Sequence, residues 1–245
     1  MIKGDCLKEM QEISDKSVDL ILCDLPYGTT PCKWDKIINF EKLWEQYIRI
    51  IKDKGVVVLF SNQPFTSKLI MSNLKYYKYN WVWVKNKAAN FLNSKYQPFK
   101  ITEDICVFSK SACAPNAKGI NSNYYPILEK GKPYFKNEKI HKVCATVRST
   151  LKEPVYKNDG TRLPNNVLYF SKDKEKLTPT QKPVKLLEYL IKTYTKENDT
   201  VMDNCAGSFS CGIACMNTGR NFIGIEKDES FFKIGMENIF RQIFH

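Results

Sequence analysis

Two parts of the chain alternate short apolar runs with segments of helical periodicity, and this alternation limits the folds open to it. The apolar runs of strand length are 18–23, 56–60, 79–84, 101–108, 200–203 and 222–226. The segments with apolar residues at helical spacing are 7–13, 40–51, 65–74, 182–194 and 212–217. The pattern predicts an α/β fold with a doubly wound, mostly parallel, Rossmann-like sheet and helices on both faces.

The first apolar run ends at Asp24-Leu25-Pro26-Tyr27, and Gly28 follows. A run bounded by Pro and Gly predicts a buried strand that ends in a sharp turn. In open α/β sheets, ligands bind at the carboxyl ends of the strands. A carboxylate accepts hydrogen bonds from an amino group and a Tyr ring stacks on a base, so this turn suits a planar guest that carries an amino group. The alternative is an ordinary strand-to-loop turn in which Tyr27 only packs.

The C-terminal part contains a second candidate ligand site. The strand 200–203 is followed by the small-residue loop Ala206-Gly207-Ser208, a helix, and a strand that ends at Glu226. This arrangement is typical of adenosine binding, because the loop lets the backbone approach the ligand and the acid binds ribose hydroxyls. A nicotinamide site would usually place G-x-G-x-x-G near the N-terminus, which disfavours a dinucleotide here.

The middle segment, 111–176, loses periodicity and is rich in Lys, Arg, Tyr, Asn, Gly and Pro. The net charge of +12 and the pI near 9.2 favour a polyanionic partner, nucleic acid being the commonest. Cations interleaved with aromatic rings suit backbone neutralisation and base stacking. The candidate DNA contacts are Lys33, Trp34, Tyr124, Lys130, Lys132, Lys136, Arg148 and Arg162. The alternatives are a basic surface kept for solubility and a solvated, irregular insertion.

Several classes of protein are disfavoured by composition. No run of 18 apolar residues exists, and the N-terminus lacks the apolar core of a signal peptide. The nine cysteines are scattered and odd in number, which fits reduced thiols. Two histidines and no C-x-x-C pair argue against a zinc site. We therefore expect a cytoplasmic protein without a bound metal.

Five motifs in one order resemble those of amino-directed DNA methyltransferases that use S-adenosylmethionine, in their permuted, beta arrangement. The matching stretches are Gly4-Asp5-Cys6-Leu7, Asp24-Leu25-Pro26-Tyr27-Gly28, Pro179-Thr180-Gln181-Lys182-Pro183, Asp203-Asn204-Cys205-Ala206-Gly207-Ser208 and Phe222-Ile223-Gly224-Ile225-Glu226. The resemblance implies a catalytic half in 1–110, a target-recognition region in 111–176 and a cofactor-binding half in 177–245. The chain looks most like the small phage-type adenine-N6 enzymes.

The resemblance also implies residue roles. Asp24 would accept a hydrogen bond from the target amino group, and the backbone carbonyl of Leu25 would accept a second one. Pro26 and Tyr27 complete the catalytic tetrapeptide, and Tyr27 would stack on a flipped-out base. Glu226 would hold the cofactor ribose. The implied cofactor-binding residues are Asp5, Cys6, Asp24, Gln181, Lys182, Asp203, Ala206, Gly207, Ser208, Phe209, Glu226 and Lys227.

Three positions depart from the family pattern. Leu25 stands where Pro is usual, Phe209 where a second loop Gly is expected, and Thr178 where His is usual. The Phe209 side chain would either crowd the cofactor or pack against the following helix.

The resemblance implies methylation of adenine N6 in a specific duplex DNA sequence, since Asp at the first tetrapeptide position usually accompanies adenine and Ser cytosine. Cytosine-N4 or RNA methylation and a catalytically silent DNA-binding module are the alternatives. A homodimer is left open, and no partner nuclease is indicated.

Overall fold

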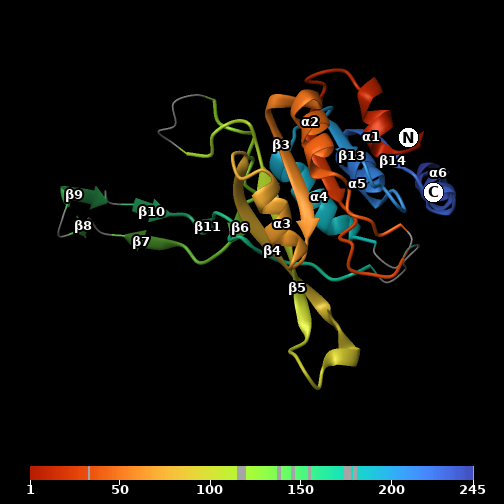
Figure 1. The fold of residues 1–245 in the computed structure, drawn as a ribbon. Coiled ribbons are helices and arrows are strands. Elements are labelled where there is room, and N and C mark those ends of the chain that lie inside the picture. The colour runs from red at the N-terminus through yellow and green to blue at the C-terminus, as the bar shows by residue number, and fades with distance from the viewer. Residues whose placement is uncertain are drawn as a thin grey trace. The chain divides into compact units, whose positions relative to one another are not determined.

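The computed structural model describes residues 1–32, 34–114, 120–136, 139–144, 147–153, 156–173, 178 and 181–244. They form two compact units (Figure 1). The first comprises Met1–Tyr125 and Asn166–His245, and the second comprises Pro126–Asn165.

The first unit is built on an eight-stranded sheet with the order β1-β14-β13-β2-β3-β5-β4-β12. Its strands are β1 (Ile2–Lys3), β2 (Val18–Asp24), β3 (Ile51–Ser61), β4 (Tyr77–Ala89), β5 (Lys100–Phe108), β12 (Val167–Tyr169), β13 (Thr200–Asp203) and β14 (Asn221–Glu226). Strand β5 is antiparallel to β3 and β4, and the other neighbouring pairs are parallel. Strand β13 lies beside β2, so the C-terminal part of the chain adjoins the first long strand.

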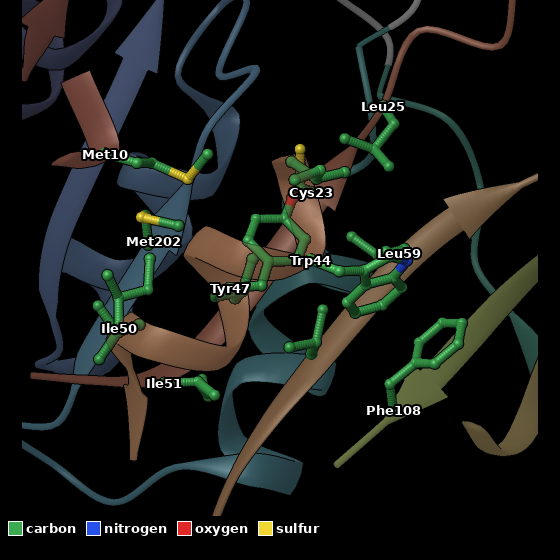
Figure 2. Close-up of a cluster of buried hydrophobic side chains, with 14 of the residues drawn as sticks. Met10, Cys23, Leu25, Trp44, Tyr47, Ile50, Ile51, Leu59, Phe108 and Met202 are labelled. Atoms are coloured by element: carbon green, nitrogen blue, oxygen red, sulfur yellow. The ribbon is translucent and has the colours of Figure 1, made fainter. Parts of the chain in front are cut away.

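Helices cover both faces of this sheet, as the sequence predicts. They are α1 (Cys6–Glu9), α2 (Phe40–Ile50), α3 (Phe65–Ser72), α4 (Val184–Tyr194), α5 (Ser210–Thr218) and α6 (Glu229–Phe244), with short 3₁₀ turns at Met10–Glu12 and Phe91–Asn93. Along β2, Ile21 and Cys23 belong to the buried cluster that contains Trp44 and Tyr47 of α2 (Figure 2). The alternate residues of β2 pack with α4 and α5 on the opposite face.

Most of the predicted elements are present with shifted ends, and a few were not predicted. Strand β3 begins at Ile51 directly after α2, because the chain pairs with β2 there although its apolar run starts only at Val56. Strands β1 and β12 are too short to show a two-residue period. Helix α6 was also missed, since it buries only Gly235 and Ile239. Among the described residues, no helix has the length and apolar character needed to cross a bilayer.

The second unit consists of nested antiparallel strand pairs. Strand β6 (Glu129–Lys130) pairs with β11 (Thr161–Arg162), β7 (Tyr134–Lys136) with β10 (Tyr156–Asn158), and β8 (Lys139–Cys144) with β9 (Val147–Glu153). The sequence indicated only irregular structure here, because residues 129–136 are exposed and an exposed strand needs no apolar alternation. The unit carries nine Lys and Arg against four Asp and Glu.

Phe209 anchors the loop that precedes α5. Its side chain is fully buried, with its ring centroid 6.2 Å from that of Phe222 and 5.7 Å from that of Phe232. Its φ of 55° lies in the left-handed region that favours glycine. A Cβ on Gly235 of α6 would lie 2.6 Å from the Phe209 ring, so this glycine lets α6 approach it closely. Of the two expected outcomes at position 209, the structure shows packing.

We expect Phe209→Gly to destabilise the fold. Loss of a buried aromatic side chain costs about 3–5 kcal/mol, and relief of the left-handed backbone returns only about 1 kcal/mol. Urea unfolding should therefore give a free energy lower by roughly 2–4 kcal/mol. The control is Phe244→Ala at an exposed position of α6, which should change stability by less than about 0.5 kcal/mol. A Phe209→Gly variant as stable as the parent would contradict this account.

Candidate active site

A cavity of about 610 Å³ opens at the carboxyl ends of β2, β13 and β14. Asp24, Asp203 and Glu226 end these three strands and line it. All four residues predicted to be catalytic line it, and so do all the predicted cofactor-binding residues except Phe209. The cofactor set in the lining is Asp5, Cys6, Asp24, Gln181, Lys182, Asp203, Ala206, Gly207, Ser208, Glu226 and Lys227. Two distant parts of the sequence thus share one cavity.

The tetrapeptide holds its acid and its aromatic ring together. The Tyr27 hydroxyl donates to Asp24 Oδ1 at 2.6 Å, and its ring stacks on Phe65 with centroids 4.9 Å apart. Leu25, which replaces the usual Pro, is buried in the cluster around Trp44 (Figure 2). Packing of the Leu25 side chain therefore restrains the turn at the position where the family usually has the rigid pyrrolidine ring of Pro.

A row of alternating charges continues from Asp24 into the sheet. Lys182 Nζ forms an ion pair with Asp24 Oδ2 and lies 3.4 Å from Glu103 Oε2, and Lys85 forms an ion pair with Glu103 Oε1. The side chains of Lys182 and Glu103 are each 11% exposed, and that of Lys85 is 4% exposed. Each buried charge thus has an opposite neighbour, as burial requires.

The pKa shifts follow from this row. Burial raises the pKa of Asp24 above its usual value, and the Lys182 ammonium opposes the rise. Burial lowers the pKa of Lys182, but the Asp24 and Glu103 carboxylates raise it more, so the pKa lies above its usual range. Burial raises the pKa of Glu103, and Lys182 and Lys85 lower it further than burial raises it. Lys182 therefore stays protonated beside a carboxylate at the edge of the cavity.

Asp35 fixes the loop that follows the tetrapeptide. Its carboxylate accepts from the backbone N–H groups of Gly28, Thr29 and Thr30 at 2.8, 2.9 and 2.7 Å, and from the Thr30 hydroxyl at 2.7 Å. Burial raises the pKa of Asp35, but these donors lower it more, and the net pKa lies below the usual value. The loop containing Trp34 is therefore held against the cavity.

The opposite wall of the cavity is a backbone cradle. Glu226 Oε2 accepts from Gly207 N at 2.8 Å, and Oε1 accepts from Asp228 N at 2.7 Å. Gly207 has φ of 51°, and a Cβ built on it meets nothing within 4 Å, so this loop borders open space. Lys227 Nζ lies 2.9 Å from Asp5 Oδ2 at the rim. Acidic side chains outnumber basic ones in the lining, so it suits a cationic guest. The acids are Asp5, Asp24, Asp35, Asp203, Glu226, Asp228 and Glu229, and the bases are Lys36, Lys182 and Lys227.

The predicted DNA contacts are not all brought to the cavity. Trp34 lines it, and Lys33 lies outside the described residues. Tyr124 packs near Tyr194, at the end of α4 opposite to the Lys182 end, so it lies away from the cavity. The other predicted DNA contacts belong to the second unit, where Lys130, Lys132 and Lys136 are exposed. The guanidinium carbon of Arg162 lies 4.7 Å from the Tyr134 ring centroid. Only the backbone of Arg148 is described.

Sequence reasoning missed Asp35, Glu103 and Lys85. Asp35 gives a weak signal, an acid a few residues after a Gly turn, which also occurs in ordinary loops. Glu103 and Lys85 lie in strands and become neighbours of Lys182 only through the pairing of β4 with β5.

A family model described as DNA methylase, the N6_N4 methyltransferase family, matches residues 18–237. The chain belongs to this family. The DNA methylase is 29% identical over 257 residues to DNA adenine methyltransferase YhdJ of Escherichia coli (strain K12), covering 98% of this chain and 82% of YhdJ. It is 27% identical over 268 residues to type II methyltransferase M.HinfI of Haemophilus influenzae, covering 98% of this chain and 67% of M.HinfI.

Solved structures show the same fold. The M1.HpyAVI–SAM complex matches the DNA methylase with a TM-score of 0.61 and 24% identity, covering 97% of each chain. The PvuII DNA methyltransferase, which is cytosine-N4-specific, matches with a TM-score of 0.64 and 14% identity, covering 96% of this chain and 84% of that one. The methyltransferase fold predicted from the motifs is therefore confirmed.

Asp203 predicts a pH dependence of stability. Burial raises its pKa to about 7 from the 3.8 of an exposed Asp, so the fold favours the protonated acid. Its contribution is fully present below about pH 4 and is lost as the pH rises to about 7, at about 1.4 kcal/mol per pH unit. Asp203→Asn does not titrate.

Urea unfolding of both proteins at pH 5 and pH 7.5 checks this expectation. When the pH rises from 5 to 7.5, the free energy of unfolding of Asp203→Asn should increase by roughly 2–3 kcal/mol relative to that of the parent. A relative stability that does not change with pH would contradict the assigned protonation of Asp203.

Asp35→Ala should lower methyl transfer by roughly 10- to 100-fold. Three backbone N–H groups of the loop lose their acceptor, but water replaces most of it, so we expect a net loss of about the 1.5–3 kcal/mol that one hydrogen bond to a charged group is worth. Affinity for S-adenosylmethionine, measured by calorimetry, should change little, since the Glu226 wall is untouched. The matched control is Asp35→Asn, which keeps one acceptor oxygen and should lose less activity. Equal activity of Asp35→Ala and the parent would show that the hydrogen bonds between Asp35 and the loop have no role in transfer.

Proposed function

We propose that this DNA methylase transfers the methyl group of S-adenosylmethionine to N6 of adenine in a specific duplex DNA sequence, with the target base flipped out of the helix. The observation that carries the proposal is that Asp24, Tyr27 and Glu226 line one cavity. Two further observations favour adenine. Asp occupies the first tetrapeptide position, and the relative YhdJ is described as a DNA adenine methyltransferase. The motif order supports the beta arrangement of the small phage-type enzymes.

The residues of the C-terminal wall fit S-adenosylmethionine, which supplies a methyl group on a positively charged sulfur. Glu226 uses one lone pair of each oxygen for backbone N–H groups, so lone pairs remain for ribose hydroxyls. Asp5 and Cys6 line the part of the cavity next to Glu226, where the adenine ring would lie. Asp203 and the Gly207 loop would face the methionine part, with Gln181 and Lys182 nearby.

The acid of the tetrapeptide would prepare the target amine. An exocyclic amine is a poor nucleophile because its lone pair is delocalised into the ring. Asp24 and the backbone carbonyl of Leu25 would accept its two hydrogens and draw them out of the ring plane, which restores the lone pair toward the methyl group. Transfer leaves an extra proton on the nitrogen, and the raised pKa of Asp24 suits this carboxylate to receive it.

Tyr27 would recognise the flipped base. Its ring lines the cavity and is braced by Phe65 and by its hydroxyl bond to Asp24. An aromatic ring held in this way stacks on a base without further ordering cost.

The basic ribbon of residues 126–165 would contact the duplex. Its exposed Lys130, Lys132 and Lys136 suit phosphate contacts. We assign the wider segment 111–176 as the target-recognition region between the catalytic and cofactor-binding parts.

The direct test is product analysis. The protein is incubated with duplex DNA and cofactor labelled in the methyl group, and the DNA is digested to nucleosides. N6-methyladenine should be the labelled product, and RNA should be labelled less than DNA. Label in cytosine, or better labelling of RNA, would overturn the base or the substrate assignment.

Two variants separate the proposed roles. Asp24→Ala should reduce transfer by at least about 100-fold, as expected for removal of an electrostatic catalytic group, and should leave cofactor affinity within about threefold. Glu226→Ala should weaken cofactor binding by roughly 10-fold or more, because it removes charge-assisted ribose hydrogen bonds. Calorimetry and single-turnover rates measure both. Loss of cofactor binding in Asp24→Ala, with Glu226→Ala unaffected, would contradict the division of roles.

A further inference from the structure

The hairpin formed by β4 and β5 extends beyond the rest of the sheet. Strand β3 pairs with β5 only as far as Asp104, and β12 pairs with β4 only as far as Val84. In the described structure, residues 85–103 pair with no third strand, and Figure 1 shows this yellow hairpin projecting from the sheet. From Lys85 to Asn90, at about 3.3 Å per residue, the arm measures about 15–20 Å.

The tip of this arm is apolar and exposed. Phe91 is 76% exposed, Leu92 92% and Tyr96 89%. The rings of Phe91 and Phe99 stack with centroids 6.3 Å apart, which orders the tip without burying it. Single exposed apolar residues are common, but several together on a projecting tip indicate an interaction surface.

The charge of the arm favours nucleic acid as the partner. Residues 86–102 contain no Asp or Glu and carry Lys87, Lys95 and Lys100. Cations beside exposed aromatic rings suit phosphate contact together with insertion among bases.

The base of the arm is tied to the catalytic acid. Lys85 on β4 and Glu103 on β5 form an ion pair, and Glu103 is linked through Lys182 to Asp24. Strand β5 is antiparallel to β3, so the arm leaves the sheet at the carboxyl edge where the cavity opens. A duplex whose base enters this cavity would therefore meet the arm.

We propose that Phe91 and Leu92 at the tip insert into the duplex beside the target base pair and stabilise the flipped-out state, while Lys87 and Lys95 contact the flanking phosphates. The inference rests on the proposed function and adds to it a device that offsets the cost of unstacking the base. That cost is a few kcal/mol. Apolar side chains are known to insert between base steps and hold them unstacked, and their stacking on the neighbouring bases would replace part of the lost base stacking.

The test compares matched and mismatched targets. The modified site is first mapped by sequencing plasmid DNA from cells that express the protein. Single-turnover methylation is then measured on a duplex with this site intact and on one in which the target base faces a mismatch, so that flipping costs less. The double variant Phe91→Ala/Leu92→Ala should lose roughly 10- to 100-fold on the matched duplex, from lost stacking of about 1–3 kcal/mol, and should recover most of the loss on the mismatch.

Controls isolate insertion from other effects. Phe244→Ala removes an exposed, stacked ring of α6 and should retain full activity on both duplexes. Lys87→Ala/Lys95→Ala should weaken binding of both duplexes equally and reduce its salt dependence, without recovery on the mismatch. All variants should retain the parent's unfolding temperature and cofactor affinity.

Three results would overturn the inference. They are full activity of the double variant on the matched duplex, a loss that the mismatch does not restore, and a change in sedimentation that shows the tip contacts a second copy of the chain. If the parent modifies cytosine, the proposed function fails but the same comparison with a mismatched cytosine still judges the tip. If the parent modifies no base, the proposed function fails, and unchanged duplex affinity of the double variant then overturns the inference.

Discussion

The parallel pairing of β13 with β2 is the interaction on which the site depends. It sets Met202 opposite Ile21 and so brings the ends of the two strands to one edge of the sheet. Asp24 and Asp203, which are 179 positions apart in the sequence, then line the same cavity. Strand β14, paired on the far side of β13, adds Glu226 to the same edge. A methyl donor bound beside Glu226 and a base bound beside Tyr27 would be able to meet only because these three strands are adjacent and parallel.

Burial of charge at this edge is compatible with stability because each charge is paired. Lys182 is shared by Asp24 and Glu103, and Glu103 is shared by Lys182 and Lys85. Removal of one partner from such a row would leave a buried charge uncompensated, which is far more costly than loss of a surface pair. The same row connects the turn at Asp24 to the β4–β5 hairpin. Asp24 and the projecting arm are therefore positioned by one set of contacts.

The sequence predicted the alternating core and most of the cavity because both leave local signals. Apolar runs locate β2, β3 and β13, and the motifs around Asp24, Gly207 and Glu226 occur at strand ends, where chain order alone implies their meeting. Glu103 left no such signal, since its role arises from pairing between strands. The paired strands of 126–165 and the hairpin tip were also missed as structures. Residues 129–136 and 91–99 are exposed, and a segment exposed on both faces has no apolar period. The motif also placed Phe209 among the cofactor-binding residues, but its side chain is buried in the core and does not line the cavity.

The central claim is that one cleft holds the cofactor against the C-terminal wall and the base against the N-terminal turn. A crystal structure of the protein with a non-reactive cofactor analogue and a duplex carrying its site tests this most directly. The account predicts the ribose hydroxyls on Glu226 and the flipped base against Tyr27, with its amino group hydrogen-bonded to Asp24. Cofactor and base bound at separate surfaces, or a base amino group bound away from Asp24, would contradict it.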